Sequence, residues 1–282
     1  MQNPSTNSRR KVGISINLRD LESKDLERTV WRYMPFPKFI SLMTYQALWF
    51  SKLNILQDSY EGLIPATVKQ RMHEQNQRHK LHYTSSELHR QIDAWPTQNE
   101  EDGRELLVVT CWFLGESESL RMWEEYGVSN EAVAVKSTIG QLAKYILVPK
   151  DETVSHLGLV SYVAHDAHEM SNYQAHQAIE RAFLKDKAHF SHEQEVRLVT
   201  LNIKTANCAS PEGKAYTFEQ VAGANMNNFE NPGLYVGVYL NSLISEVVLC
   251  PSAEEWFAKL VCRIAELSGL SAPVSRSRLQ NA

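Results

Sequence analysis

The chain has 282 residues, of which 43% are apolar and 22% are charged. This length allows one or two domains and a sizeable core, and the composition excludes a disordered chain, a collagen and a coiled coil. The 29 basic and 33 acidic residues leave a net charge of −4, so there is no global basic field to hold nucleic acid. The sequence contains no run of about 18 apolar residues, so we expect no membrane-spanning helix.

The cysteines and the N-terminal residues indicate a cytoplasmic protein. Four cysteines occur without a C-x-x-C pair, which predicts neither a zinc site nor a disulfide scaffold. Reduced thiols are typical of the cytoplasm, and the N-terminus lacks the apolar stretch of a signal peptide. Residues 1–26 are polar and predict a mobile arm, which can pair as an edge strand through Val12, Ile14 and Ile16.

The first part of the chain predicts a strand, a helix and a second strand before a long polar segment. Alternation predicts a strand over 29–34, and helical spacing predicts a short amphipathic helix over 37–46. A strand over 47–52 precedes a loop. Residues 64–106 are polar and helix-prone, and we interpret them as an inserted helical segment that could form a lid over a cleft. Within this segment, residues 67–91 carry five basic and two acidic side chains.

The second part of the chain alternates irregularly between strands and helices. A near-continuous apolar run predicts a buried strand over 106–113, and a helix over 118–126 follows it. Further strands are predicted over 132–136, 157–163, 195–201, 234–240 and 244–248, and further helices over 138–145, 166–187 and 254–268. We therefore expect an α+β fold in which residues 27–282 form a single core of mixed and antiparallel strands with the helical insertion.

Several well-known motifs are absent from the sequence. It contains no G-x-G-x-x-G, P-loop, G-x-S-x-G or H-E-x-x-H pattern. His165 and His168 have the spacing of a metal pair on a helix, and His176 follows eight residues later. A second ligand cluster is missing, so we interpret these histidines as solvated helix residues and predict no metal site.

The strongest candidate for catalytic chemistry lies in residues 190–199. Strand periodicity places Glu193, Glu195 and Arg197 on one face. Of two such carboxylates, one can stabilise a cationic, sugar-like transition state while the other accepts a proton from the nucleophile. The competing interpretation is an edge-strand salt bridge between Glu195 and Arg197, which contributes less than about 1 kcal/mol when exposed.

Arg32 and Thr110 are further candidates. Arg32 lies between Trp31 and Tyr33 in a strand, and a guanidinium among aromatic rings suits phosphate or carboxylate recognition. Its alternative role is a stem packed on the core with the charge at the surface. The Thr110 hydroxyl can either hydrogen-bond a ligand amide or ribose, or simply pack within the sheet. Cys111 has no base beside it and is not predicted as a nucleophile.

Four segments follow one another in an informative order. They are WRYMPFPKFISLMTYQALWFSKLNILQDSYEG, TCWFLGESESLRMWEEYG, HFSHEQEVRLV, and YLNSLISEVVLCPSAEEW with the closing VSRSRL. Together they resemble an uncharacterised bacterial family, the domain of unknown function 2971, over roughly residues 29–279. This resemblance implies no established activity.

A second resemblance suggests an activity. An Arg on one strand, a hydroxyl on a middle strand and Glu-x-Glu before a Val-rich strand, in this order, resemble the Arg-Ser-Glu class of ADP-ribosyltransferases. The resemblance implies an ADP-ribosyltransferase-like fold and NAD as co-substrate. It implies that Arg32 grips the dinucleotide and that Thr110 supports the nicotinamide ribose pocket. It also implies that Glu195 holds the ribose hydroxyl as the nicotinamide bond breaks, with Glu193 as the acceptor-side carboxylate.

Three hypotheses about function stay open. The first is an NAD-consuming transferase or glycohydrolase, a toxin-like or phage-defence effector acting on a protein or nucleic acid, with Tyr33 and Ser51 as further cofactor-binding candidates. The second is a nucleic-acid-directed effector that contacts phosphates through residues 67–91. The third is a non-catalytic sensing or interaction domain. Its motivation is the bulky Trp112, together with Arg197, which can neutralise Glu195. The sequence names neither the acceptor nor the oligomeric state.

Overall fold

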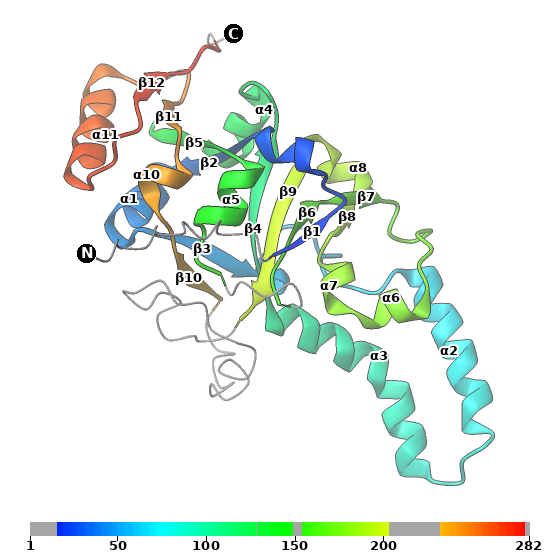
Figure 1. Ribbon diagram of the computed structural model, residues 1–282. Helices are drawn as coiled ribbons and strands as arrows, with labels where there is room; N and C mark the ends of the chain where they lie inside the picture. Colours follow the sequence, from blue (N-terminus) through cyan, green and yellow to red (C-terminus); the bar gives the residue numbers. More distant parts are fainter. Residues whose placement is uncertain (1–15, 128, 149–153, 203–231, 280–282) are drawn as a thin grey trace, which may run out of the picture.

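The fold is mixed α+β, as predicted, and is built on one large sheet. The computed structural model describes residues 16–127, 129–148, 154–202 and 232–279 (Figure 1). The ten strands of this sheet are β1 (Asn17–Arg19), β2 (Thr29–Pro35), β3 (Ala47–Lys52), β4 (Leu107–Leu114), β5 (Ala132–Thr138), β6 (His156–Leu159), β9 (Glu195–Leu201), β10 (Gly233–Gly237), β11 (Glu246–Leu249) and β12 (Val274–Arg276).

The sheet is branched. Eight strands follow the order β1-β6-β9-β4-β2-β5-β11-β12, while β3 pairs with β4, and β10 pairs with β3. The β1–β6 and β11–β12 pairs are parallel, and the other pairs are antiparallel. Strand β4 therefore contacts β2 at one end and β3 at the other, and this branch positions the site described below.

Several helices pack on this sheet, and α1 and the turn that follows α4 lie beside the strands of the branch. Helix α1 (Phe36–Tyr45) packs against β2, β3, β5 and the C-terminal helix α11 (Glu255–Leu267). Helix α5 (Ile139–Tyr145) follows β5 and is capped by Thr138, whose hydroxyl oxygen accepts a hydrogen bond from the Gln141 amide at 3.2 Å. The short helix α4 (Leu120–Met122) continues into a π-helical turn, η3 (Trp123–Gly127), beside β2. A further short helix, α10 (Leu240–Leu243), packs on α5.

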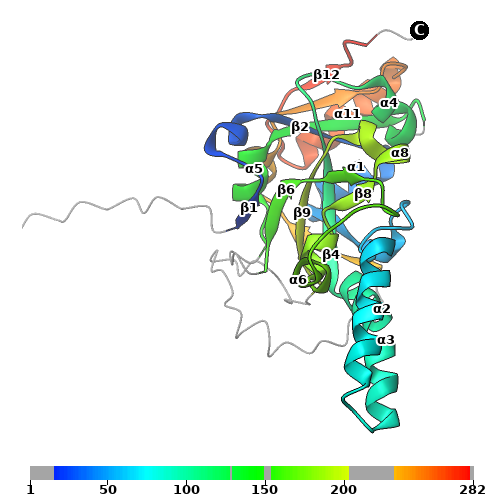
Figure 2. The same cartoon turned by 90° about the vertical axis from the view of Figure 1, so that its right-hand side faces the viewer.

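The polar segment forms a helical hairpin that projects from the sheet (Figures 1 and 2). It consists of α2 (Ala66–Lys80) and α3 (Ser86–Leu106), and α3 leads directly into β4. Lys80 pairs with Asp93, and Lys69 pairs with Glu100 at 2.8 Å, so ion pairs connect the two helices. No described helix is both long enough and apolar enough to cross a membrane.

The prediction of one helix over 166–187 is wrong. This stretch forms two short helices, α6 (Asn172–His176) and α7 (Ala178–Arg181), and strand β8 (Leu184–Asp186). Strand β8 pairs in parallel with β7 (Ser161–Val163) in a separate two-stranded sheet. The buried Arg181 guanidinium donates to the carbonyls of Ala175, Gly62 (2.8 Å) and Asn99 (3.1 Å). These contacts with distant segments outweigh the helix propensity of the stretch.

The N-terminal residues that the structure describes extend the sheet. Strand β1 is an edge strand that pairs with β6, so part of the predicted arm does pair in this way, but β1 begins after Ile16 and contains none of the alternating residues. A 3-10 helix, η1 (Ser23–Glu27), leads to β2, and Leu26 packs against the core. The rest of the predicted arm, including Val12 and Ile14, lies outside the described residues.

Candidate functional site

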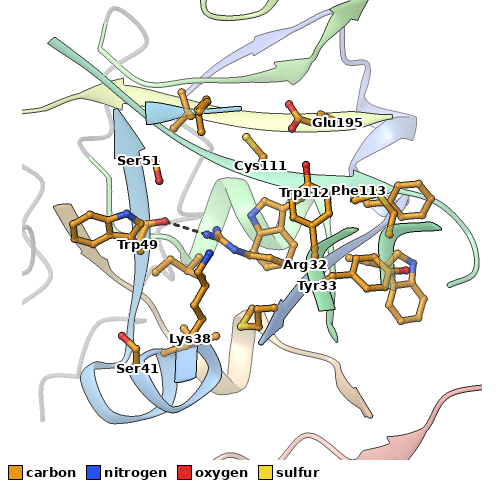
Figure 3. A pocket seen from close by; sticks show the side chains of 18 of the residues that line it. Arg32, Tyr33, Lys38, Ser41, Trp49, Ser51, Cys111, Trp112, Phe113 and Glu195 are labelled. Atoms are coloured by element: carbon orange, nitrogen blue, oxygen red, sulfur yellow. Dashed lines mark hydrogen bonds between the residues drawn. The ribbon is translucent and has the colours of Figure 1, made fainter. Parts of the chain in front are cut away.

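A cavity of about 690 Å³ opens where β2 and β3 diverge (Figure 3). Strand β2 pairs with Phe113 and Leu114 of β4, whereas β3 pairs with Val108 and Val109. Residues 110–112 lie between these two contacts. The space left between β2 and β3 is lined by side chains from α1, β2, β3, β4, β9 and β10. This volume lies within the ordinary range for a small-molecule site.

Two cations without acidic partners face this cavity. The Arg32 guanidinium donates to the Thr110 hydroxyl and to the Trp49 carbonyl at 3.1 Å, and it lies 5.9 Å from the Trp112 ring centroid. Lys38 of α1 lies beside it and also lines the cavity. Among the described residues, neither side chain forms an ion pair. Burial lowers the pKa of Arg32 to about 10, and burial together with the Arg32 charge lowers that of Lys38. An anionic ligand would relieve this uncompensated charge.

The sequence-predicted residues divide between the two sides of β4. Thr110 is buried and bonded to Arg32, and it is not among the described residues that line the cavity. Glu195 does line the cavity, but it shares its side of β4 with Cys111 (Figure 3). The β4–β9 register explains this, because Phe113 is opposite Glu195 and Thr110 is opposite Leu198, two positions that point to opposite faces. Arg32 and Glu195 therefore meet at one cavity through the gap in the sheet.

Tyr33 and Ser51 also line the cavity. The Tyr33 hydroxyl accepts a hydrogen bond from the Ser119 amide at 2.9 Å, so the oxygen helps to begin α4. The Tyr33 ring packs edge-on against Trp123, with centroids 4.8 Å apart. Ser51 lies at the point where β3 pairs with both β4 and β10. The Ser51 side chain points into the cavity (Figure 3) and remains a candidate ligand contact.

Behind Glu195 lies a buried cluster of charges that the sequence only partly revealed. Arg197 is fully buried and binds Glu61 in a bidentate pair, at 2.8 and 3.0 Å. The same guanidinium donates to Glu195 Oε2 at 2.5 Å. Lys185 donates to Glu193 and to Glu195 Oε1, the latter at 3.2 Å. Three carboxylates and two cations thus share one buried site.

This cluster sets the protonation of its carboxylates. Burial alone would raise the pKa of Glu195, but the charges of Arg197 and Lys185 outweigh it and hold the pKa at about 2. Burial, followed by the charge of Glu195, raises the pKa of Glu193. Burial also raises the pKa of Glu61. Glu195 is therefore an ionised carboxylate on the cavity wall, while the fold favours the charged form of Glu193 less than that of Glu195.

Two tyrosines and a cysteine complete the surroundings of the two glutamates. The Tyr126 hydroxyl donates to Glu193, and the Tyr162 hydroxyl accepts from the Glu195 amide at 2.8 Å. Burial raises the pKa of Cys111 to about 12, so this thiol stays protonated and is a poor nucleophile.

The geometry corrects two sequence interpretations of the Glu-x-Glu segment. The competing interpretation of an exposed edge-strand salt bridge is wrong, because β9 lies between β6 and β4 and the Glu195–Arg197 pair is buried. Glu193 precedes the strand, in a 3-10 turn η4 (Ser191–Glu193), after α8 (Lys187–Phe190). Among the described residues that line the cavity, Glu195 is the acidic one, so Glu193 reaches the cavity only indirectly, through Lys185 and Tyr126.

Sequence reasoning missed Glu61, Lys185 and Lys38. Glu61 was noted only as a loop residue, and Lys185 lies in the stretch that was predicted as a helix. A single Arg197 cannot balance the two acidic side chains of the Glu-x-Glu segment, which was a sequence signal for a further cation such as Lys185; Glu61 carried no such signal, because its loop lies far from Arg197 in the chain. Lys38 is a basic residue in a segment, 31–56, that contains no Asp or Glu.

The predicted lid and phosphate-binding roles of the hairpin find no support in its contacts. None of the described cavity-lining residues comes from α2 or α3. The nucleic-acid hypothesis uses four of the basic residues in 67–91, namely Lys69, Arg71, Arg78 and Lys80, and three of these pair with acidic side chains. These pairs are Lys69–Glu100, Arg71–Glu169 and Lys80–Asp93. Arg78 is the remaining member of this set.

The three histidines do not come together, and the interpretation of His165 as a solvated helix residue is wrong, because it is buried and lies in a turn. His165 and His168 lie outside any helix, and the His165 ring stacks on Tyr60 with centroids 4.5 Å apart. His176 packs against Trp95 instead. Over the described ranges, one group has metal-ligand atoms within 4.8 Å of one another, namely Glu125, His192 and Glu193. These side chains already bind one another, Lys185 or Tyr126, which accounts for their proximity.

A scan against models of known protein families finds no match for this chain, and a search of curated proteins finds none with significant similarity.

Proposed function

We propose that this protein is an NAD-consuming, ADP-ribosyltransferase-like enzyme whose active site is the cavity between β2 and β3. The observation that carries the proposal is the meeting of the unpaired Arg32 guanidinium and the ionised Glu195 carboxylate on one cavity. A dinucleotide that is anionic at its diphosphate, and becomes cationic at its ribose during reaction, needs both charges.

The cavity residues have distinct roles in this proposal. Arg32, held by the Thr110 hydroxyl and the Trp49 carbonyl, binds the diphosphate. Glu195 holds a ribose hydroxyl and stabilises positive charge at the anomeric carbon as the bond to nicotinamide breaks. Nicotinamide leaves with the bonding electron pair. A water molecule or an acceptor group then forms the new bond to the anomeric carbon and releases its proton to solvent.

Arg197 and Lys185 position Glu195 rather than react themselves. Each donates to a different oxygen of the carboxylate, so the side chain is fixed and stays ionised at neutral pH. A carboxylate oxygen has two acceptor sites, which leaves room for a ribose hydroxyl. The predicted supporting role of Thr110 becomes an indirect one, because this residue contacts Arg32 rather than lining the cavity.

One observation favours the alternative of a non-catalytic sensing domain. Trp112 is buried on the cavity wall, where the resemblance to ADP-ribosyltransferases expects a small residue. A bulky ring there reduces the space for nicotinamide. A domain of this kind would bind an anionic nucleotide through Arg32 without breaking it.

Calorimetry with NAD and a nicotinamide-release assay test both candidates on the full chain. The Arg32→Gln variant should weaken NAD binding by about 10- to 150-fold, since a hydrogen bond from a charged group contributes about 1.5–3 kcal/mol. Glu195→Gln should bind NAD but release nicotinamide at least about 100-fold more slowly. The exposed Arg263→Gln is the matched control for charge and should change neither quantity.

Each outcome of this experiment separates the candidates. NAD binding without nicotinamide release in the wild-type protein would support the sensing domain. Equal turnover by the wild-type protein and Glu195→Gln would remove Glu195 from the mechanism. Absence of NAD binding would refute the proposal as a whole.

A further inference from the structure

Exposed aromatic rings gather at the mouth of the cavity. Tyr235 of β10 is paired across the strands with Trp49 of β3, and their ring centroids lie 5.0 Å apart. The Tyr235 ring also lies 5.1 Å from that of Tyr45, at the end of α1. Tyr45 is 63% exposed and Tyr235 is 48% exposed. We call these three residues the aromatic patch, and both Trp49 and Tyr235 also line the cavity.

A hydrogen bond from helix α1 fixes the Tyr235 ring of the aromatic patch. The Tyr235 hydroxyl and the Ser41 hydroxyl form a hydrogen bond at 2.9 Å, which connects β10 to α1. Ser41 and Lys38 lie one turn apart or less on α1 and face the same cavity (Figure 3). Because Tyr235 is fixed by this bond and by two ring contacts, it loses little conformational entropy when a ligand stacks on it.

The charge around the aromatic patch differs from that of the whole chain. Residues 31–56 and the β10 segment 233–237 contain no Asp or Glu, although the net charge of the chain is −4. Lys38 is exposed at the cavity and forms no ion pair with any described residue. The surface thus combines aromatic rings with positive charge. Phosphate-linked bases match both properties, since bases stack on rings and phosphates attract cations.

We propose that the aromatic patch and Lys38 bind single-stranded nucleic acid, with a base on the rings and its phosphate at Lys38. This names the acceptor class for the NAD-consuming reaction and rests on that proposed function. A single strand fits better than a duplex, because rings can stack only on bases that are free of their neighbours. Arg32, deeper in the cavity, remains available for NAD. The surface is distinct from residues 67–91, whose basic side chains are mostly paired.

Fluorescence anisotropy tests this proposal without NAD. The probes are labelled single strands of about 10 nucleotides, a length within the usual range for such sites. RNA and DNA of the same sequence form two arms and show which nucleic acid is preferred. Tyr235→Ala and Tyr45→Ala should each weaken binding by about 5- to 150-fold, which corresponds to about 1–3 kcal/mol of stacking per base. Tyr235→Phe keeps the ring but loses the bond to Ser41, so it should bind much more nearly as the wild-type protein does than Tyr235→Ala.

Two further measurements separate specific binding from non-specific attraction. Tyr173→Ala removes an exposed ring on α6, far from the cavity in the fold, and should leave binding unchanged. The affinity should fall about threefold between about 50 and 200 mM salt, since one cation contributes a slope of about −0.7 with single strands. Lys38→Gln should remove most of this salt dependence.

Several results would overturn the proposal. One is a lack of detectable binding to single strands. Others are an affinity for duplex, or for a mononucleotide, that equals the affinity for single strands. The last is a loss of binding in Arg78→Gln but not in Tyr235→Ala. The last result would move the surface to the hairpin. If strands bind but NAD does not, the NAD-consuming function fails, and this surface stands as a nucleic-acid site without the acceptor role. If NAD binds and strands do not, only this inference fails.

Discussion

Replacing each glutamate of the Glu-x-Glu pair by glutamine tests the buried charge cluster. The two substitutions are chemically identical and lie two residues apart, and both side chains are almost fully buried. Glu195→Gln removes the charge that compensates Arg197 and Lys185. Glu193→Gln instead resembles the protonated form toward which burial and Glu195 push that carboxyl group. We therefore expect the two variants to differ in how much stability they lose and in how that loss changes with pH.

The structure sets the size of the difference. A fall in the pKa of Glu195 from the ordinary value of 4.5 to about 2 corresponds to about 3 kcal/mol of preference for the charged form in the fold. Breaking a buried ion pair by removing one partner costs about 3–5 kcal/mol. Glu195→Gln should thus lower the free energy of unfolding by about 3 kcal/mol or more at pH 7. Glu193→Gln should lower it by less than Glu195→Gln does, because the raised pKa of Glu193 means that the fold favours its charged form less; the amide oxygen keeps the hydrogen bond from Tyr126, although the pair with Lys185 is lost.

The pH dependence of the two variants also differs in sign. The pKa of Glu195 is depressed in the fold, so its stabilising contribution exists above pH 4.5 and is lost as the pH falls toward 2. The deficit of Glu195→Gln relative to the wild-type protein should therefore shrink in acid. The pKa of Glu193 is raised, so its contribution is present below its ordinary value and is lost as the pH rises through the folded value. Glu193→Gln should gain on the wild-type protein as the pH rises.

Urea unfolding followed by tryptophan fluorescence measures these changes. With a slope of about 3 kcal/mol per molar urea, a loss of 3 kcal/mol moves the midpoint by about 1 M. Titrations at several pH values between acid and mildly alkaline conditions separate the two carboxyl groups. Equal losses for Glu193→Gln and Glu195→Gln at pH 7 would refute the inference that the fold favours the charged form of Glu195 more than that of Glu193. A deficit of Glu195→Gln that persists unchanged at low pH would refute the ion-pair explanation.

Two further predictions concern Arg32 and Arg181, for which the described part of the chain shows no ion pair with an acidic side chain. In thermal unfolding, Arg32→Gln should leave stability unchanged or raise it by up to about 2 kcal/mol. The reason is that the substitution removes a desolvated charge whose pKa is lowered to about 10. A loss of more than about 1 kcal/mol would mean that Arg32 is a structural residue. Arg181→Met should lower stability by about 3–5 kcal/mol, since it leaves the carbonyls of Gly62 and Asn99 without donors. Hydrogen exchange should then rise first in α3, and uniform exchange across the sheet would contradict this.

Local sequence signals predicted most elements, because short apolar patterns and turn residues act over only a few positions. The strand over 47–52 and the helices over 37–46 and 254–268 agree with β3, α1 and α11 within two residues at each end. The apolar spacing within α11 does not decide which of its faces is buried. Trp256 and Leu267 are 51% and 67% exposed, whereas Phe257 and Val261 face the core. The helix carries two apolar faces, and only the position of the sheet decides which one is buried.

The candidate site shows the same division. The sequence by itself identified Arg32 and Glu195 as polar residues in strands, and it placed Glu195 beside Arg197. It did not determine that β2 and β3 separate along β4, because strand pairing joins segments that are distant in the chain and leaves no local pattern. The gap between these strands creates the cavity and brings Arg32 and Glu195 to it from opposite sides of β4.

Composition and periodicity thus determined that the chain folds as an α+β protein and which of its segments are strands or helices for most of the chain, although not over 166–187. The tertiary structure decided the charge of each functional group. Glu61 lies in a loop and Lys185 in a stretch that was predicted as a helix. Only the folded chain brings Glu61 to Arg197 and Lys185 to Glu193 and Glu195. The pKa of a carboxyl group depends on burial and on charges within a few ångströms, and both are properties of the folded chain rather than of neighbours in sequence.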